Sequence, residues 1–204
     1  MAFILIDAQI SANPAPSKAE LQTYLEDHAL KVGSESTGGY QQIFYIYNDV
    51  KIFITKNQNN HTHPVISGRY MAWEEVIDGF PQIILYDVLN KTELQVTQTG
   101  TNLSPAIWKN QIVWVGLDNG LRQIFYFDGK QTKQLSFDNT SLRPAIRDNI
   151  IAYAQYTGNQ ENPWRVVSYD LDRAPNEDPY QIVNEGTEEN AWPHFAKNEL
   201  QTSL

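Results

Sequence analysis

Carboxylates near the ends of short apolar runs are the side chains of this sequence best suited to acid–base chemistry. They are Glu74, Glu75, Asp78, Asp118, Glu188 and Glu189. Two carboxylates held about 5 to 9 Å apart beside a sugar can act as general acid and base in glycoside hydrolysis. Glu74 with Asp118, or Asp78 with Glu188, would make such a pair if the fold brought the two together. A carbohydrate-active enzyme, a glycoside hydrolase or lyase, is therefore one hypothesis, although acidic loop residues more often serve solubility.

His61 and His63 are the residues with the spacing of metal ligands. Imidazole is a common ligand of zinc, nickel and copper, and residues two apart in an extended chain point to the same side. No cysteine accompanies the two histidines. A His-x-His at a protein surface more often has no ligand, so the sequence predicts no cofactor and leaves this pair as a weaker metal hypothesis.

Several other functions lack their sequence signals. Without cysteine there is no thiol nucleophile, disulfide or cysteine-ligated zinc. Neither a Gly-x-Ser-x-Gly elbow nor a glycine-rich phosphate loop occurs. The net charge of -9 disfavours nucleic acid, which is bound mainly by Lys and Arg. No run approaches the roughly 20 apolar residues of a membrane helix, and no signal peptide is visible, so we expect a cytoplasmic protein, or a secreted or periplasmic one if a leader has been removed.

A repeat of about 40 residues organises the chain and must position these side chains. Proline starts each copy, at Pro64, Pro105, Pro144 and, less completely, Pro193. The matching segments are PVISGRYMAW (64–73), PAIWKNQIVW (105–114) and PAIRDNIIAY (144–153), followed by QIILYD (82–87), QIFYFD (123–128) and RVVSYD (165–170). Each copy reads as four short strands, because Val, Ile, Tyr, Phe and Trp alternate with polar residues between Gly, Asn, Asp or Pro.

This pattern resembles the TolB-type, WD40-like β-propeller repeat over roughly residues 41 to 200. The resemblance rests on the proline-led first strand, the Trp-ended second strand and the third strand ending in Tyr-Asp or Phe-Asp. It implies an all-β fold, a small propeller of four-stranded blades in a single domain, 1–204. The full repeats are expected at 64–104, 105–143 and 144–192. Trp73, Trp114 and Tyr153 share one repeat position, so we expect them to pack between blades.

The two ends of the chain read as parts of one more blade. QIFY at 42–45 and KIFIT at 51–55 match third and fourth strands, whereas PHFAKNEL at 193–200 matches an inner strand and the start of a second. Residues 193–204 with 41–63 are therefore predicted to form a composite blade, giving about four blades and closing the ring. Residues 1–40 are predicted to hold a strand at 2–6 and one helix. Ser17 and Glu20 have capping-box spacing, and Gly33 is a plausible C-cap.

Loops on one face of the predicted propeller carry the candidate binding residues. Loops that join second to third strands and loops that join blades emerge on the same face. The candidates there are Glu74, Glu75, Asp78, Asp118, Asn119, Trp164, Glu188, Glu189, Asn190 and Trp192. We predict a non-catalytic binding or scaffolding protein that binds a protein, peptide or glycan through this face, which is acidic and carries aromatic side chains. The alternatives are the carbohydrate-active enzyme and an assembly unit completed by another copy of the chain.

Overall fold

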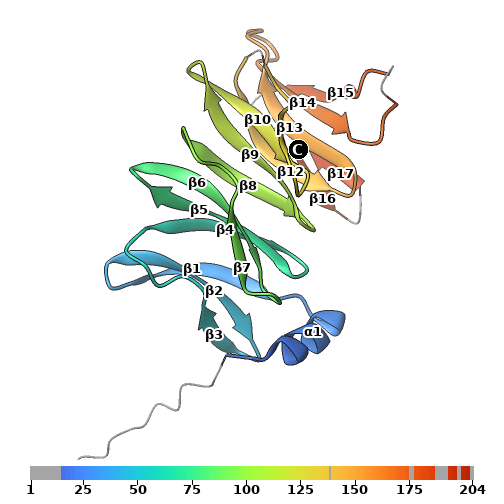
Figure 1. The fold of residues 1–204 in the computed structure, drawn as a ribbon. Coiled ribbons are helices and arrows are strands. Elements are labelled where there is room, and N and C mark those ends of the chain that lie inside the picture. The colour runs from blue at the N-terminus through green and yellow to red at the C-terminus, as the bar shows by residue number, and fades with distance from the viewer. Residues whose placement is uncertain (1–14, 138, 175–176, 187–192, 197–198, 203–204) are drawn as a thin grey trace, which may run out of the picture.

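The computed structural model describes residues 15–137, 139–174, 177–186, 193–196 and 199–202. Antiparallel sheets stand side by side along an arc, with one helix at the N-terminal end (Figure 1). Three sheets have four strands and correspond to the three full repeats, so the predicted all-β propeller blades are confirmed.

The strands of each blade follow one another in sequence and in space. The first blade consists of β4 (His61–Ser67), β5 (Tyr70–Ile77), β6 (Phe80–Asp87) and β7 (Thr92–Gln95). The second consists of β8 (Asn102–Trp108), β9 (Gln111–Asp118), β10 (Leu121–Phe127) and β11 (Thr132–Gln134). The third consists of β12 (Ser141–Arg147), β13 (Ile150–Tyr156), β14 (Trp164–Asp170) and β15 (Tyr180–Gly186).

Two-residue turns set the register between second and third strands in the first two blades. Asp78 and Gly79 have φ values of 51° and 83°, and Asn119 and Gly120 have 48° and 79°. A turn with positive φ at both central residues matches the twist of the strands that it joins, and Asp-Gly and Asn-Gly are the preferred pairs for it. The sequence therefore fixes where these hairpins turn.

The core lies between the sheets. Trp73, Trp114 and Tyr153 are 0%, 1% and 2% exposed, as expected for residues that pack between blades. Trp114 belongs to a cluster with Ile83 of the preceding blade. Since one face of a blade cannot be buried without its neighbour, the repeats stabilise one another.

The N-terminal helix α1 (Lys18–Asp27) begins with the predicted capping box. Ser17 Oγ accepts a hydrogen bond from the Glu20 amide at 3.3 Å, and Glu20 Oε2 accepts one from the Ser17 amide at 2.7 Å. Leu21 is fully buried and joins a core cluster that includes residues of the first blade. The helix thus packs on the propeller.

Gly33 does not cap this helix, contrary to the prediction. The helix ends at Asp27 with an extended His28 as its C-cap, and it has ten residues. Gly33 lies instead in β1 (Lys31–Thr37), opposite Phe44. A Cβ atom at Gly33 would lie 2.7 Å from Phe44 Cζ. The close approach of this ring is what requires glycine here.

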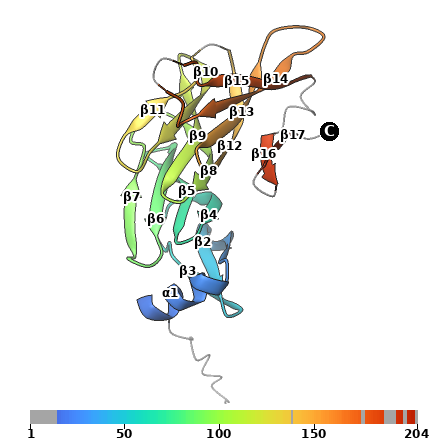
Figure 2. The ribbon, with the colours of Figure 1, turned by 90° about the vertical axis from the view of Figure 1, so that its right-hand side faces the viewer.

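The terminal repeat segments form two smaller sheets. β1 pairs with β2 (Tyr40–Tyr47), which pairs with β3 (Val50–Phe53), and β16 (Pro193–Ala196) pairs with β17 (Glu199–Thr202). Among the described strands the two groups are separate sheets, at different ends of the stack (Figures 1 and 2). Their closure into one composite blade stays a prediction, and the strand expected at 2–6 lies outside the described residues.

Candidate binding site at the mouth of the propeller axis

The inner strand of each blade is interrupted at the same place. Pairing with the second strand shifts between Thr62 and Val65, between Leu103 and Ala106, and between Leu142 and Ala145. The residue before each marker proline has positive φ: 51° at His63, 54° at Ser104 and 54° at Arg143. This backbone conformation is uncommon for residues other than glycine, and such bulges redirect side chains. In each of the three blades, therefore, a polar residue and the proline after it leave the regular pairing between first and second strands at equivalent positions.

These bulges gather around one cavity of about 390 Å³. It is lined by His63, Pro64, Val65, Ser104, Pro105, Arg143, Pro144 and Pro193. The lining comes from the inner strands β4, β8, β12 and β16, so the cavity lies where these strands approach the axis. We call this cavity the mouth. Proline rings have few conformations to lose, and a ligand here would meet a largely preformed wall.

Glu74 supports this mouth from within the sheet. Its carboxylate is 5% exposed and accepts a 2.7 Å hydrogen bond from the Ser104 amide of the second blade. It also accepts a hydrogen bond from Thr62 Oγ1 at 3.3 Å and lies 3.1 Å from His63 Nδ1. Glu74 therefore fixes two of the three bulges relative to each other. Contrary to the prediction, it is a buried strand residue and not part of an exposed loop.

Glu75 is also buried in β5, and its side chain points to the other face of the strand. Its Oε1 accepts hydrogen bonds from Asn57 Nδ2 at 3.0 Å and Asn59 Nδ2 at 2.8 Å. The same oxygen lies 3.3 Å from His61 Nε2, and His61 Nδ1 donates to the Gln41 carbonyl at 3.0 Å. Glu75 thus ties the first blade to the segment that enters it from the N-terminal sheet. It too was predicted on a loop, and is not.

The protonation of the His61–Glu75 pair follows from these contacts. Burial alone lowers the pKa of His61, but the Glu75 carboxylate and the Gln41 carbonyl outweigh it and the pKa is raised. Burial raises the pKa of Glu75, but the adjacent His61 imidazole and the hydrogen bonds from the two asparagines outweigh it and the pKa is lowered. Both shifts favour an ion pair inside the sheet.

The two histidines do not converge as a metal-binding pair would. His61 is fully buried beside Glu75, whereas the His63 side chain is 69% exposed beside Glu74. The bulge at His63 breaks the extended geometry that would have placed both rings on one side. Within the described residues, no group of three or more His, Cys, Asp or Glu side chains could hold a metal ion.

The other predicted residues that the structure describes are not among those that line the mouth. Asp78 and Asn119 are exposed in the hairpin turns, and Asp118 accepts hydrogen bonds from Gln134 at 3.3 Å and Asn119 at 3.2 Å. Trp164 is partly buried and makes an edge contact with Tyr156. Glu188, Glu189, Asn190 and Trp192 lie outside the described residues. Glu74 and Asp118 have separate hydrogen-bond partners, so this catalytic pair gains no support, and Asp78 with Glu188 stays a prediction.

Sequence reasoning missed Ser104 and Arg143 as mouth residues. The marker prolines served only to define the repeat, although the residue before each of them occupies the bulge. A comparison of the residues preceding Pro64, Pro105 and Pro144 would have grouped His63, Ser104 and Arg143, because equivalent positions of a propeller surround one axis.

Comparison with known proteins agrees with the architecture. No family model matches the sequence, and no curated protein matches it. A TolB structure from Agrobacterium tumefaciens has a TM-score of 0.59 at 18% identity, covering 78% of this chain and 62% of that one. TolB from Acinetobacter baumannii has a TM-score of 0.58 at 17% identity, covering 81% and 43%. A nidogen–laminin complex has a TM-score of 0.52 at 11% identity, covering 81% and 64%.

The chain therefore spans less than two thirds of the length of either TolB chain. At these identities the likeness concerns the fold, which agrees with the repeat pattern, the four-stranded sheets and their shared axis. The chain has the fold of a TolB-type β-propeller.

Proposed function

We propose that this chain is a non-catalytic binding protein that holds a segment of a protein or peptide at the mouth of its axis. The observation that carries the proposal is the convergence of three inner-strand bulges on one cavity. A repeated departure from regular pairing costs ladder hydrogen bonds, and bulges are common where a side chain must be re-aimed. The TolB-like fold supports the proposal as a scaffold on which loops and strand ends can carry a binding site.

The lining favours a polypeptide over a sugar. Among the described residues, it contains prolines, a valine and small or basic polar side chains, but no Trp, Tyr or Phe ring on which a sugar could stack. Arg143 provides a planar guanidinium that suits a carboxylate or a backbone carbonyl. Glu74, which the acid–base hypothesis would need free, accepts hydrogen bonds from the Ser104 amide of the second blade and from Thr62. Glu75 is likewise engaged with Asn57 and Asn59.

Selection from a peptide library on the immobilised protein tests this proposal. Recovered peptides would be titrated calorimetrically against the wild type, Arg143→Ala and the matched control Arg122→Ala, which removes an exposed guanidinium from β10. We expect Arg143→Ala to weaken binding about tenfold or more, since hydrogen bonds to charged groups contribute about 1.5–3 kcal/mol. Peptides that bind Arg143→Ala as tightly as the wild type would refute a binding site at the mouth.

A further inference from the structure

The third blade departs from the repeat at a position that faces the second blade. The strand registers place Trp114 opposite Phe125 in the second blade and Tyr153 opposite Val167 in the third. Trp114 and Phe125 stack with their ring centroids 5.9 Å apart. The first blade carries Ile84 opposite Trp73, so the third blade has the smallest side chain of the three at this position.

A second departure lies next to the first. The second position lies two residues before Val167, at the start of the third-strand motif. The other sheets carry Gln42, Gln82 or Gln123 there, and each glutamine donates to a carbonyl of the connection that follows its own sheet. The third blade has Arg165 instead. Its Nε and Nη2 donate to Gln155 Oε1 at 2.9 and 2.6 Å. The position that binds a connecting loop in the other sheets thus carries a guanidinium oriented by a neighbouring amide.

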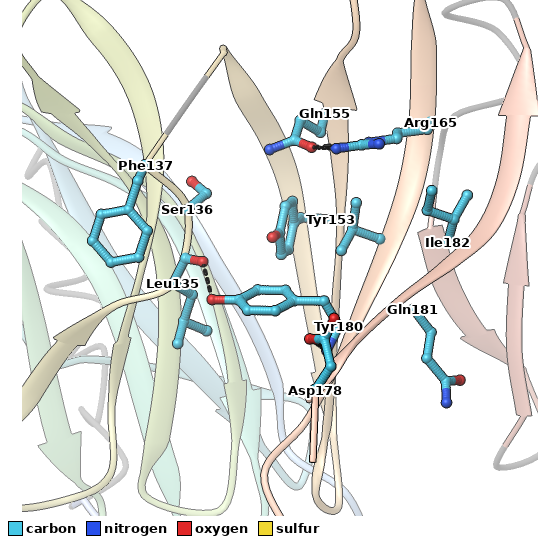
Figure 3. Close-up of a pocket in the computed structure, with 11 residues that line it drawn as sticks. Leu135, Ser136, Phe137, Tyr153, Gln155, Arg165, Asp178, Tyr180, Gln181 and Ile182 are labelled. Atoms are coloured by element: carbon cyan, nitrogen blue, oxygen red, sulfur yellow. Dashed lines mark hydrogen bonds between the residues drawn. The ribbon is translucent and has the colours of Figure 1, made fainter. Parts of the chain in front are cut away.

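Val167 and Arg165 both line a cavity of about 630 Å³ between the second and third blades (Figure 3). It is lined by Leu135, Ser136, Phe137, Tyr153, Gln155, Arg165, Val167, Asp178, Tyr180, Gln181 and Ile182. Leu135, Tyr153 and Val167 are almost fully buried and make an apolar floor. Phe137 and Ile182 are 64% and 56% exposed and form part of the rim.

One wall of the cavity is held in place by a bond between blades. Tyr180 Oη donates to the Leu135 carbonyl at 2.7 Å, and the Tyr180 ring packs edge-on against Tyr169. Figure 3 shows Arg165 and Asp178 toward opposite ends of the cavity, with the rings of Tyr153 and Tyr180 between them. The cavity is therefore preformed, with a positively charged side chain toward one end and a negatively charged one toward the other.

We propose that this cavity binds a small apolar carboxylate, with its carboxylate at Arg165 and its apolar body on the floor made by Leu135, Tyr153 and Val167. The volume lies within the roughly 300–1,000 Å³ of ligand pockets, which combine apolar walls with a few polar groups that fix orientation. The guanidinium suits a carboxylate geometrically, and the Asp178 carboxylate disfavours the reverse orientation. The cavity shares no lining residue with the mouth, so this site is independent of the proposed function.

N-acetylphenylalanine is a suitable probe, with its neutral amide, N-acetylphenylalaninamide, as the matched ligand. Ligand-observed NMR and calorimetry would give the affinity of both compounds for the wild type and three variants. Arg165→Gln and Val167→Phe introduce residues that equivalent positions of the second blade already carry. Arg122→Gln, at an exposed arginine of β10, is the control.

We expect the carboxylate to bind the wild type about tenfold more tightly than the amide, as charge-assisted hydrogen bonds permit. Arg165→Gln should abolish that preference, Val167→Phe should abolish binding of both compounds, and Arg122→Gln should change neither. No binding at millimolar probe, equal affinity for both compounds, or unchanged binding to folded Val167→Phe would each overturn the proposal. If Val167→Phe fails to fold, the carboxylate preference of Arg165→Gln still decides it.

Discussion

The buried pair of His61 and Glu75 yields a prediction about the stability of the first blade. The two side chains are 0% and 7% exposed, and Glu75 also accepts hydrogen bonds from Asn57 and Asn59. Glu75→Gln keeps the size of the side chain but removes its charge. His61 would then be buried next to a neutral amide, and its protonated form would lose its counter-ion.

The expected loss follows from this geometry. Removing one partner of a buried ion pair costs about 3–5 kcal/mol. Glu75→Gln should lie near the lower limit, about 3 kcal/mol, because its amide oxygen can still accept from one asparagine. For a domain of this size each kcal/mol lowers Tm by roughly 2–4 °C, so Tm should fall by about 6–12 °C. The double variant Glu75→Gln/His61→Gln should lose less than the sum of the single variants, since the two residues are in contact.

The pH dependence provides a second and more specific signature. The pKa of His61 is raised above 6.5, so its stabilising contribution is complete below pH 6.5 and is lost as the pH rises through the raised value. The pKa of Glu75 is lowered below 4.5, so its contribution is present above pH 4.5 and is lost as the pH falls through the lowered value. The pair should therefore stabilise the protein most between pH 4.5 and 6.5.

Chemical denaturation monitored by tryptophan fluorescence, at pH values within this window and well above it, is the appropriate assay. Glu161→Gln removes a carboxylate from an exposed loop and is the matched control. The difference between wild type and Glu75→Gln should shrink as the pH rises above 6.5, whereas the control should track the wild type throughout. A loss below about 1 kcal/mol, or a difference independent of pH, would show that the pair does not stabilise the blade as an ion pair.

Three further substitutions test local features by thermal unfolding. Gly33→Ala would place a methyl group 2.7 Å from the Phe44 ring and should cost about 1–3 kcal/mol; an unchanged Tm would mean that the ring moves freely aside. Ser17→Ala removes the N-cap of α1 and should cost about 1 kcal/mol, whereas no loss would mean that helix packing alone suffices. Ser136→Ala leaves the buried Gln123 amide oxygen without the hydroxyl that donates to it at 2.6 Å and should cost about 1–3 kcal/mol; a neutral effect would indicate a replacement donor.

The repeat made most of the fold predictable, because three copies report the same strand pattern and the same turns. The recurrence of Trp73, Trp114 and Tyr153 in register predicts that they pack between blades, and the structure buries all three. The helix start was also predictable, since a capping box is a local signal. Its end was not, because Gly33 could equally serve a cap or a close approach, and only the position of Phe44 distinguishes the two.

The burial of Glu74 and Glu75 could not be inferred from residue type. Charged residues after a tryptophan suggest that a strand has ended, but β5 continues to Ile77. The second blade offers the missing signal, since Val115 and Gly116 occupy the equivalent positions in β9 and neither is polar. Partners distant in sequence, such as the Ser104 amide, compensate the buried charge, and a single-sequence pattern does not reveal them.

The second-strand position that holds Glu75 in the first blade holds Gln155 in the third, and the two residues have different roles. In the first blade Glu75 and His61 form an ion pair, whereas in the third blade Gln155 orients Arg165. If both arrangements were mainly structural, Arg165→Gln would destabilise the protein as Glu75→Gln does. If the third-blade site has instead been adapted to a ligand, Arg165→Gln should leave stability within about 0.5 kcal/mol, because it restores the residue found in the other sheets. Comparing the two variants in the absence of any ligand therefore separates a residue retained for stability from one retained for binding.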